Sequence, residues 1–224
     1  MRIFSYVTTT IDLRIAFIIL GSIILLLLNL ILEGIFLNII AVVTLIWFVA
    51  VAYLIYHSLS FVKGDSGELD VASVLNKLPQ GYSYLKDFVN GKRGNIDGIV
   101  VGPTGIWSIE IKNYQRGTIT FKNGVLYNDD APLENALTQT YAEAKSLESF
   151  LYESLSTTLQ VNPVLVFTNK KTRLHFGFNK QKGVYVIGIK WLSDLVQKQE
   201  LGYNLPPEQQ EVIKNVLKKN TSIL

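Results

Sequence analysis

The residues best suited to do chemistry lie in the segment 95–113, where two β-type runs flank the turn Gly102–Gly105. If these runs pair as an antiparallel hairpin centred on that turn, Asp97 lies directly opposite Glu110. Side chains two positions apart on a strand share a face, so Lys112 joins the two carboxylates. The spacing therefore predicts two acids and one ammonium group on a single face of a sheet.

Two carboxylates that face each other across a strand pair repel and destabilise the sheet unless something compensates their charge. A divalent cation is the chemically natural compensation for Asp97 and Glu110, and Lys112 would then hold a water or an anionic substrate. Another interpretation stays open, in which the acids pair with Lys112 or Arg93 in a satisfied surface network. The chain has no cysteine and 2 histidines, so a metal site must use carboxylates and carbonyls, which favours Mg²⁺ or Mn²⁺.

Hydropathy divides the chain into two parts of different character. Hydrophobic residues make up 49% of the 224 residues, but residues 15–55 are nearly all apolar and the remainder has the composition of a soluble domain. That remainder is long enough to bury a core, and the net charge of +3 is weak evidence for nucleic-acid binding. The predicted parts are a membrane anchor at 1–60 and a folded domain at 64–224, with its core at about 64–168 and a helical extension at 190–220.

Two uncharged stretches, about 15–32 and 35–55, each approach the roughly 20 residues that a helix needs to cross a bilayer. Neither stretch shows an amphipathic stripe, which favours a transmembrane helical hairpin over a pair of buried core helices. Arg2 and Arg14 precede the first stretch and Lys63 follows the second, whereas the turn between them carries no base. By the positive-inside rule, both termini and the C-terminal domain are expected on the cytoplasmic side of the cell membrane.

The first helix of the folded domain is expected at about Asp65–Lys77, with Asp65 or Ser66 as its N-cap. Glu68 would lie on or beside the helix face that packs on the sheet. A carboxylate there is costly unless it is paired or bound to a metal. Alternatively, Glu68 occupies a solvated edge near the helix start, where the helix dipole favours it.

The remaining elements predict an α/β fold. Strands are expected at 82–89, in both arms of the central hairpin, at 117–128 as a hairpin with an Asn123–Gly124 turn, and at 162–167 and 183–189. A long helix is expected from about Pro132 to Leu155, with an apolar stripe that includes Tyr141, Leu147 and Leu151 and with Gln139 off its centre. Two amphipathic helices, at about 191–199 and 207–219, close the chain.

This order of elements, with Glu on the first helix, Asp on the second strand and Glu-x-Lys on the third, resembles the PD-(D/E)XK nuclease superfamily. The closer resemblance is to the NERD domain, the nuclease-related domain. The residues that carry it are Gly67–Glu68, Ile96–Gly105, Ile109–Tyr114, Gly117 and Gln139. The resemblance implies a restriction-endonuclease-like mixed sheet flanked by helices over roughly residues 64–167, preceded here by the transmembrane helical hairpin.

The resemblance also implies a metal-dependent nuclease. Asp97, Glu110 and the backbone carbonyl of Ile111 would ligate Mg²⁺ or Mn²⁺. Glu68 would bind a second metal or position the first through water. The implied reaction is the hydrolysis of nucleic-acid phosphodiesters, with DNA favoured over RNA, and the anchor adds the lipid bilayer as a partner.

Two further residues have implied roles. Lys112 would orient or activate the attacking water and stabilise the transition state, and Gln139 would support the ligands or contact the substrate. The basic stretch Asn169–Arg173 either contacts phosphates or forms a solvated loop. Two interpretations from other classes stay open: a catalytically inactive nucleic-acid-binding or scaffold module, and a small membrane protein whose hairpin assembles with a partner complex.

Overall fold

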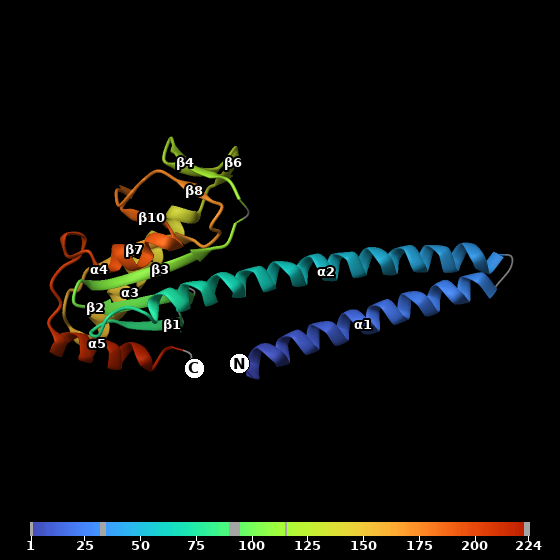
Figure 1. Cartoon of the computed structure of the whole chain (residues 1–224), viewed down its shortest axis with the longest axis horizontal. Coiled ribbons are helices and arrows are strands. Elements are labelled where there is room, and N and C mark those ends of the chain that lie inside the picture. The colour runs from blue at the N-terminus through green and yellow to red at the C-terminus, as the bar shows by residue number, and fades with distance from the viewer. Residues whose placement is uncertain (1, 32–34, 90–94, 115, 222–224) are drawn as a thin grey trace. The chain divides into compact units, whose positions relative to one another are not determined.

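The computed structural model describes residues 2–31, 35–89, 95–114 and 116–221, leaving aside the side chains of 2–14, 30–31, 35–37 and 57–65. The chain divides into two compact units, Met1–Val62 and Lys63–Leu224 (Figure 1). Each unit is described by itself below.

Two long apolar helices make up the first unit. Helix α1 spans Arg2–Ile31, and helix α2 spans Ile35–Leu75 and so continues into the second unit. Asn29 Nδ2 donates a hydrogen bond to Thr44 Oγ1 at 3.4 Å. A Cβ added to Gly21 would lie 3.2 Å from the Trp47 ring, so the indole packs where the glycine leaves room. The two helices therefore lie along each other.

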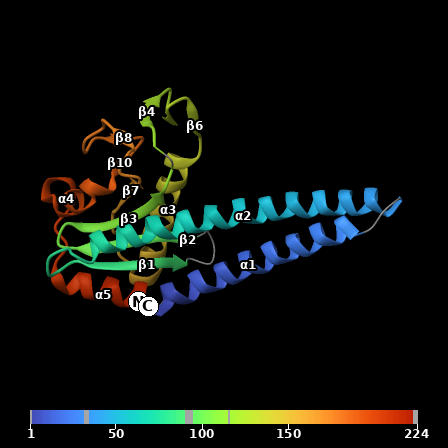
Figure 2. The same ribbon diagram turned by 45° about the vertical axis from the view of Figure 1, so that its right-hand side comes forward.

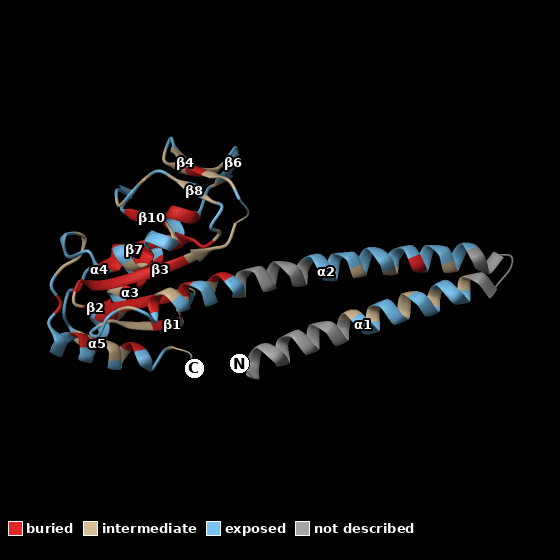
Figure 3. Cartoon of the chain, in the orientation of Figure 1, coloured by how far each residue is buried: buried red, intermediate tan, exposed pale blue. Residues whose placement is uncertain are grey.

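One helical stretch in the described part of the chain is long and apolar enough to cross a membrane. It is Asn38–Tyr56, with a mean hydropathy of 2.6, and its side chains are mostly exposed (Figure 3). The stretch Ile15–Asn29 in α1 is apolar but shorter. The expected turn at Glu33–Gly34 lies outside the described residues, so a hairpin of two spans remains an expectation from the sequence.

Helix α2 does not break between the two units, so the predicted helix start at Asp65 or Ser66 is wrong. A glycine inside a helix costs only about 1 kcal/mol, and extension of an existing helix needs no new nucleus. Gly67 does not mark the start of a helix, but allows close packing of α2 on the sheet. A Cβ there would lie 3.0 Å from Thr168 Oγ1 and 3.2 Å from Asn113 Cβ, so the glycine lets α2 approach two strand ends closely.

The second unit has the expected mixed α/β fold, built around a six-stranded sheet with the order β1-β2-β3-β7-β10-β9 (Figure 2). Its strands are β1 Ser83–Val89, β2 Asn95–Gly102, β3 Gly105–Lys112, β7 Val161–Phe167, β9 Lys180–Gln181 and β10 Val184–Gly188. Strands β1, β2 and β3 are antiparallel neighbours, whereas β3, β7 and β10 run parallel. A smaller sheet has the order β6-β5-β4-β8, from β4 Thr118–Lys122, β5 Val125–Asn128, β6 Ala131–Leu133 and β8 Arg173–Leu174.

The central hairpin has the register expected from the sequence. Gly102 pairs with Gly105 next to the turn, and the ladder continues to the pair of Gly98 and Ile109. Gly105 has a φ of 112°, which its lack of a Cβ permits. The second hairpin turns at Asn123–Gly124, whose φ values of 50° and 81° are both positive, as a type I′ turn requires.

Helix α3, Ala136–Leu155, begins four residues later than predicted. The segment around Pro132 instead pairs with β5 as the short edge strand β6, a position that tolerates the missing N–H of proline. Leu147 and Leu151 of the expected apolar stripe are fully buried, but Tyr141 is 43% exposed. The chain closes with η1 Ile189–Trp191, α4 Leu192–Gln197, η2 Gln199–Leu201 and α5 Pro207–Lys218, close to the two helices expected there.

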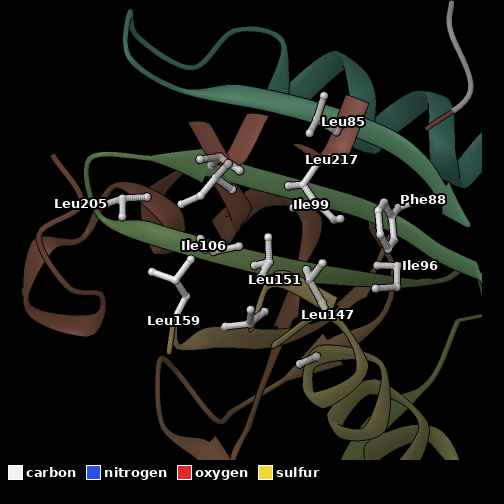
Figure 4. Packing of buried hydrophobic residues seen from close by; sticks show 14 residues of the cluster. Leu85, Phe88, Ile96, Ile99, Ile106, Leu147, Leu151, Leu159, Leu205 and Leu217 are labelled. Atoms are coloured by element: carbon white, nitrogen blue, oxygen red, sulfur yellow. The ribbon is translucent and has the colours of Figure 1, made fainter. Parts of the chain in front are cut away.

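The two faces of the large sheet carry separate cores. One face packs on α3 and α5 through a cluster that includes Leu85, Ile99, Ile106, Leu147 and Leu217 (Figure 4). The opposite face packs on α2 and α4 through a cluster that includes Val71, Leu75, Val100, Trp107 and Ile109. Glu110 lies on the face that α3 covers, since Gln139 of that helix donates to it. Lys112, two residues further along β3, shares that face and contacts Glu110.

Candidate metal and phosphodiester site

Asp97, Glu110 and Lys112 come together where the β2–β3 ladder ends. Just beyond its last pair, Gly98 with Ile109, the Ile111 N–H donates to Asp97 Oδ2 at 2.8 Å, so a carboxylate takes the place of a backbone acceptor. On the same strand, Lys112 Nζ lies 2.6 Å from Glu110 Oε1. The two acids and the lysine therefore lie close together at the end of the β2–β3 ladder, near helix α3.

Helix α3 adds an amide and a third carboxylate. Gln139 Nε2 donates to Glu110 Oε1 and to Glu143 Oε1, at 2.9 Å in each case. Glu143 is only 7% exposed, and its Oε2 has no hydrogen-bond partner in the described part of the chain. The amide of Gln139 therefore bridges two buried acids.

Glu143 is not among the site residues predicted from the sequence, although the helix periodicity could have indicated it. It follows Gln139 by four residues and so lies one turn further along the same helix face. Its neighbours on that face include Ala144 and Leu147, both buried. A carboxylate within an apolar face needs a compensating partner, and that requirement could have singled it out.

Glu68 has a different partner. Its Oε2 lies 2.9 Å from Lys86 Nζ, and both side chains are about three-quarters buried. Lys86 pairs with Gly98 across the β1–β2 ladder. Lys86 therefore compensates the charge of this carboxylate. Glu68 also lies near enough to Asp97 for its charge to raise the pKa of Asp97.

The site is short of positive charge. Burial, followed by the charge of Glu110, raises the pKa of Asp97 to about 7, although the Ile111 N–H opposes this rise. Burial also raises the pKa of Glu110 to about 7, against the effect of Lys112 and with the help of the Glu143 charge. The pKa of Glu143 is raised by burial as well. Three neighbouring carboxyl groups thus hold protons more tightly than in water, and an added cation would relieve them.

Lys112 is a cation in this setting. Burial lowers the pKa of its ammonium group, but the hydrogen bond and charge of Glu110, with the charges of Tyr114 and Asp97, outweigh burial and raise it. At neutral pH the group is therefore a hydrogen-bond donor and a positive charge rather than a general base.

The donor chemistry fits a hard divalent cation. Asp97 and Glu110 offer carboxylate oxygens and Ile111 offers a carbonyl on the same strand, which are the ligand types of Mg²⁺ and Mn²⁺. In the part of the chain that is described, no three His, Cys, Asp or Glu side chains group closely enough to hold a metal ion. Lys112 supplies the compensating charge beside Glu110, so a cation would have to replace that contact.

Replacing Gln139 by Ala should destabilise the folded domain by about 1–3 kcal/mol at pH 8, since two buried carboxyl groups lose their shared donor. Adding Glu143→Gln in the same chain should recover much of the loss, because one of the like charges disappears. Thermal unfolding of the single and double variants measures both effects. Thr138→Ala, at an exposed position on the same helix, is the control. An equal loss of stability in the single and double variants would contradict the shared hydrogen bonding of Glu110 and Glu143 by Gln139.

Comparison with known proteins bears on the second unit. Residues 63–168, somewhat less than half of the chain, match the family model described as "NERD: Nuclease-related domain". Asp97, Glu110, Lys112, Gln139 and Glu143 all lie within the match, which supports a place for this domain in the nuclease-like superfamily. No curated protein matches the chain.

A similar solved structure is the small subunit of the heterodimeric restriction endonuclease R.BspD6I. It shares 15% sequence identity over 70% of this chain and 90% of that chain, with a TM-score of 0.29. A similarity at this level carries no argument about the activity of the present chain.

Proposed function

We propose that this chain is a membrane-anchored, metal-dependent nuclease that hydrolyses nucleic-acid phosphodiesters. The observation that carries the proposal is the meeting of Asp97, Glu110 and Lys112 at the end of one strand pair. Both acids are largely buried and hold protons up to about pH 7, and the lysine stays charged beside them. The match to the nuclease-related domain supports the same chemistry.

Each residue has a definite task in this proposal. A divalent cation held by Asp97, Glu110 and the Ile111 carbonyl would supply a hydroxide nucleophile at neutral pH and neutralise charge on the phosphoryl oxygens. Lys112 would donate hydrogen bonds to the attacking water or to a phosphoryl oxygen, where negative charge develops. Gln139 would hold Glu110 in place through Oε1. Glu68, paired with Lys86 and near Asp97, would bind a second metal or position the first through water.

The anchor belongs to the same proposal. The apolar stretches of α1 and α2 would cross the cell membrane as two spans, with the nuclease-like domain and both termini in the cytoplasm. The exposed apolar surface of Asn38–Tyr56 supports one span. Arg2, Arg14 and Lys63 flank the two stretches and support the orientation. A membrane-held enzyme acts on substrate that reaches the inner surface of the membrane.

A second candidate is a domain of the same fold that binds nucleic acid without cutting it. The contact between Lys112 and Glu110 favours it, since the ammonium group already compensates the carboxylate that a metal would use. In this alternative the cation never replaces the lysine. The two candidates therefore differ in metal binding rather than in affinity for nucleic acid.

Titration of the full chain with Mn²⁺ in detergent, followed by incubation with labelled DNA and RNA, separates the candidates. The nuclease proposal expects calorimetric Mn²⁺ binding and Mn²⁺-dependent cleavage, both lost in Asp97→Ala and in Glu110→Ala. Asp130→Ala removes an exposed carboxylate from the turn between β5 and β6 and should change neither. Nucleic-acid binding without Mn²⁺ binding or cleavage would overturn the nuclease in favour of the second candidate.

A further inference from the structure

The two sheets of the domain are connected by a pair of segments that run in the same direction. Strands β3 and β7 are parallel neighbours in the large sheet, and the strands that follow in the small sheet, β4 and β8, are parallel neighbours too. Between them, the Thr168 N–H donates to the Lys112 carbonyl at 3.1 Å and the Arg173 N–H donates to the Gly117 carbonyl at 2.8 Å. These segments, residues 113–114, 116–117 and 168–173, are called the bridge here. The bridge begins beside Lys112.

Hydrogen bonds and a ring contact hold the bridge in a defined conformation. Asn169 Nδ2 donates to the Tyr114 carbonyl at 3.0 Å, and Asn169 Oδ1 accepts from the Lys171 N–H at 2.9 Å. The Thr172 N–H also donates to the Asn169 carbonyl at 2.9 Å. At the base of the turn, the rings of Tyr114 and Phe167 are 5.9 Å apart. One asparagine thus closes the turn and fastens it to the strand that leaves the candidate site.

Four cations project from the bridge into solvent: Arg116, Lys170, Lys171 and Arg173. None of them forms an ion pair with an acidic side chain in the described part of the chain. Among the described side chains, the lysines that do form ion pairs are Lys86, Lys112, Lys145, Lys198 and Lys214. The bridge therefore gathers four cations that form no ion pair with a described acid, although Asp129 lies beside Gly117. A surface with such an excess of positive charge attracts a polyanion.

We propose that the bridge holds the phosphates of a nucleic-acid strand next to the phosphate that lies at Lys112. This inference rests on the proposed function and adds to it the surface that positions the substrate. When one phosphate of a nucleic-acid strand lies at the site, its neighbouring phosphates must lie on the adjacent surface. The bridge is adjacent surface of this kind, because it begins beside Lys112. Contacts from lysine and arginine to phosphates supply affinity and register without reading sequence, so the bridge would accept many sequences.

The small sheet extends this surface. Lys122 precedes the turn between β4 and β5, and Lys182 lies against that turn, since a Cβ on Gly124 would meet its Nζ at 2.6 Å. Both lysines are exposed and make no ion pair with a described acid. The positively charged surface therefore continues from the bridge onto the small sheet.

The test compares two triple variants of the full chain in detergent, with fluorescence anisotropy of labelled duplex and single-stranded DNA in EDTA over a range of salt concentrations. In Lys170→Ala/Lys171→Ala/Arg173→Ala, affinity near 0.15 M salt should fall about tenfold or more. The slope of log K against log salt for duplex DNA should fall by about 3, since each phosphate contact contributes roughly 0.9. The control Lys77→Ala/Lys145→Ala/Lys198→Ala removes the same charge from exposed positions outside the bridge and should keep both quantities.

The outcomes separate this inference from the proposed function. Calorimetric Mn²⁺ binding should be the same in the bridge variant and the unmodified chain, because none of the three side chains contacts Asp97 or Glu110. Unchanged DNA affinity and salt slope in the bridge variant would overturn the inference and leave the nuclease proposal standing. Failure of the unmodified chain to bind DNA or RNA at all would overturn both.

Discussion

Replacing Lys112 by Ala should slow phosphodiester cleavage by about 100-fold or more while Mn²⁺ binding persists. The reason is that the Lys112 ammonium group would donate to the phosphoryl group where negative charge develops. Removing one such preorganised donor typically costs about 10²–10³ in rate. Single-turnover cleavage of labelled DNA at saturating Mn²⁺, together with calorimetric Mn²⁺ titration of the same protein, measures the two quantities.

Conservative variants at this position test the assigned role. Because the role is that of a charged donor, Lys112→Arg should keep more activity than Lys112→Gln, which has similar length but no charge. If Lys112 were a neutral base instead, Arg would be the poorer replacement because its guanidinium does not lose a proton in this pH range. Loss of Mn²⁺ binding in Lys112→Ala would contradict the account, since the lysine competes with the cation for Glu110 and should not support its binding.

The free energy of unfolding should fall as pH rises from 5 to 8 in the absence of divalent cations, and Asp97→Asn should remove part of this fall. The pKa of Asp97 is raised from 3.8 to about 7 in the folded state, so the folded state binds more protons than the unfolded state between these values. Stability from such a group is fully present at low pH and declines as pH rises through the folded pKa. At pH 8 the Asn variant should therefore be more stable by up to about 4 kcal/mol, and the two proteins should converge near pH 4.

Thermal unfolding of the full chain in detergent, followed by tryptophan fluorescence, provides the measurement, with Asp130→Asn as an exposed control. Addition of Mn²⁺ should stabilise the unmodified chain more at pH 8 than at pH 5, because the cation must displace protons from the acids at the lower pH. A stability difference between Asp97→Asn and the unmodified chain that grows toward low pH would contradict the assigned direction of the pKa shift.

The sheet and the position of its acids could be predicted because they depend on local rules. The alternation of side chains and one four-residue turn set the register that places Asp97 and Glu110 together, and the structure has that register as far as Gly98 and Ile109. The turn at Asn123–Gly124 has the conformation that its two residues favour. These features involve residues close in sequence, for which periodicity and turn chemistry are informative.

The contacts that could not be predicted join residues far apart in the sequence. Glu68 pairs with Lys86 because α2 and β1 meet on one sheet face, and neither helix periodicity nor strand alternation specifies that meeting. The approach of Glu143 to Glu110 depends on how α3 rotates over the sheet, which only the packed core determines. Helix α2 continues past Asp65 because a cap signal in the sequence does not end a helix whose next turns are packed against the domain.

The most direct test of the central claim is a crystal structure of the protein soaked in Mn²⁺, with anomalous scattering recorded at the manganese edge. The account predicts one anomalous peak within coordination distance of carboxylate oxygens from both Asp97 and Glu110, with the Lys112 ammonium moved away from Glu110. A map without a peak there, in which Lys112 keeps its contact with Glu110, would contradict metal-dependent hydrolysis at this site.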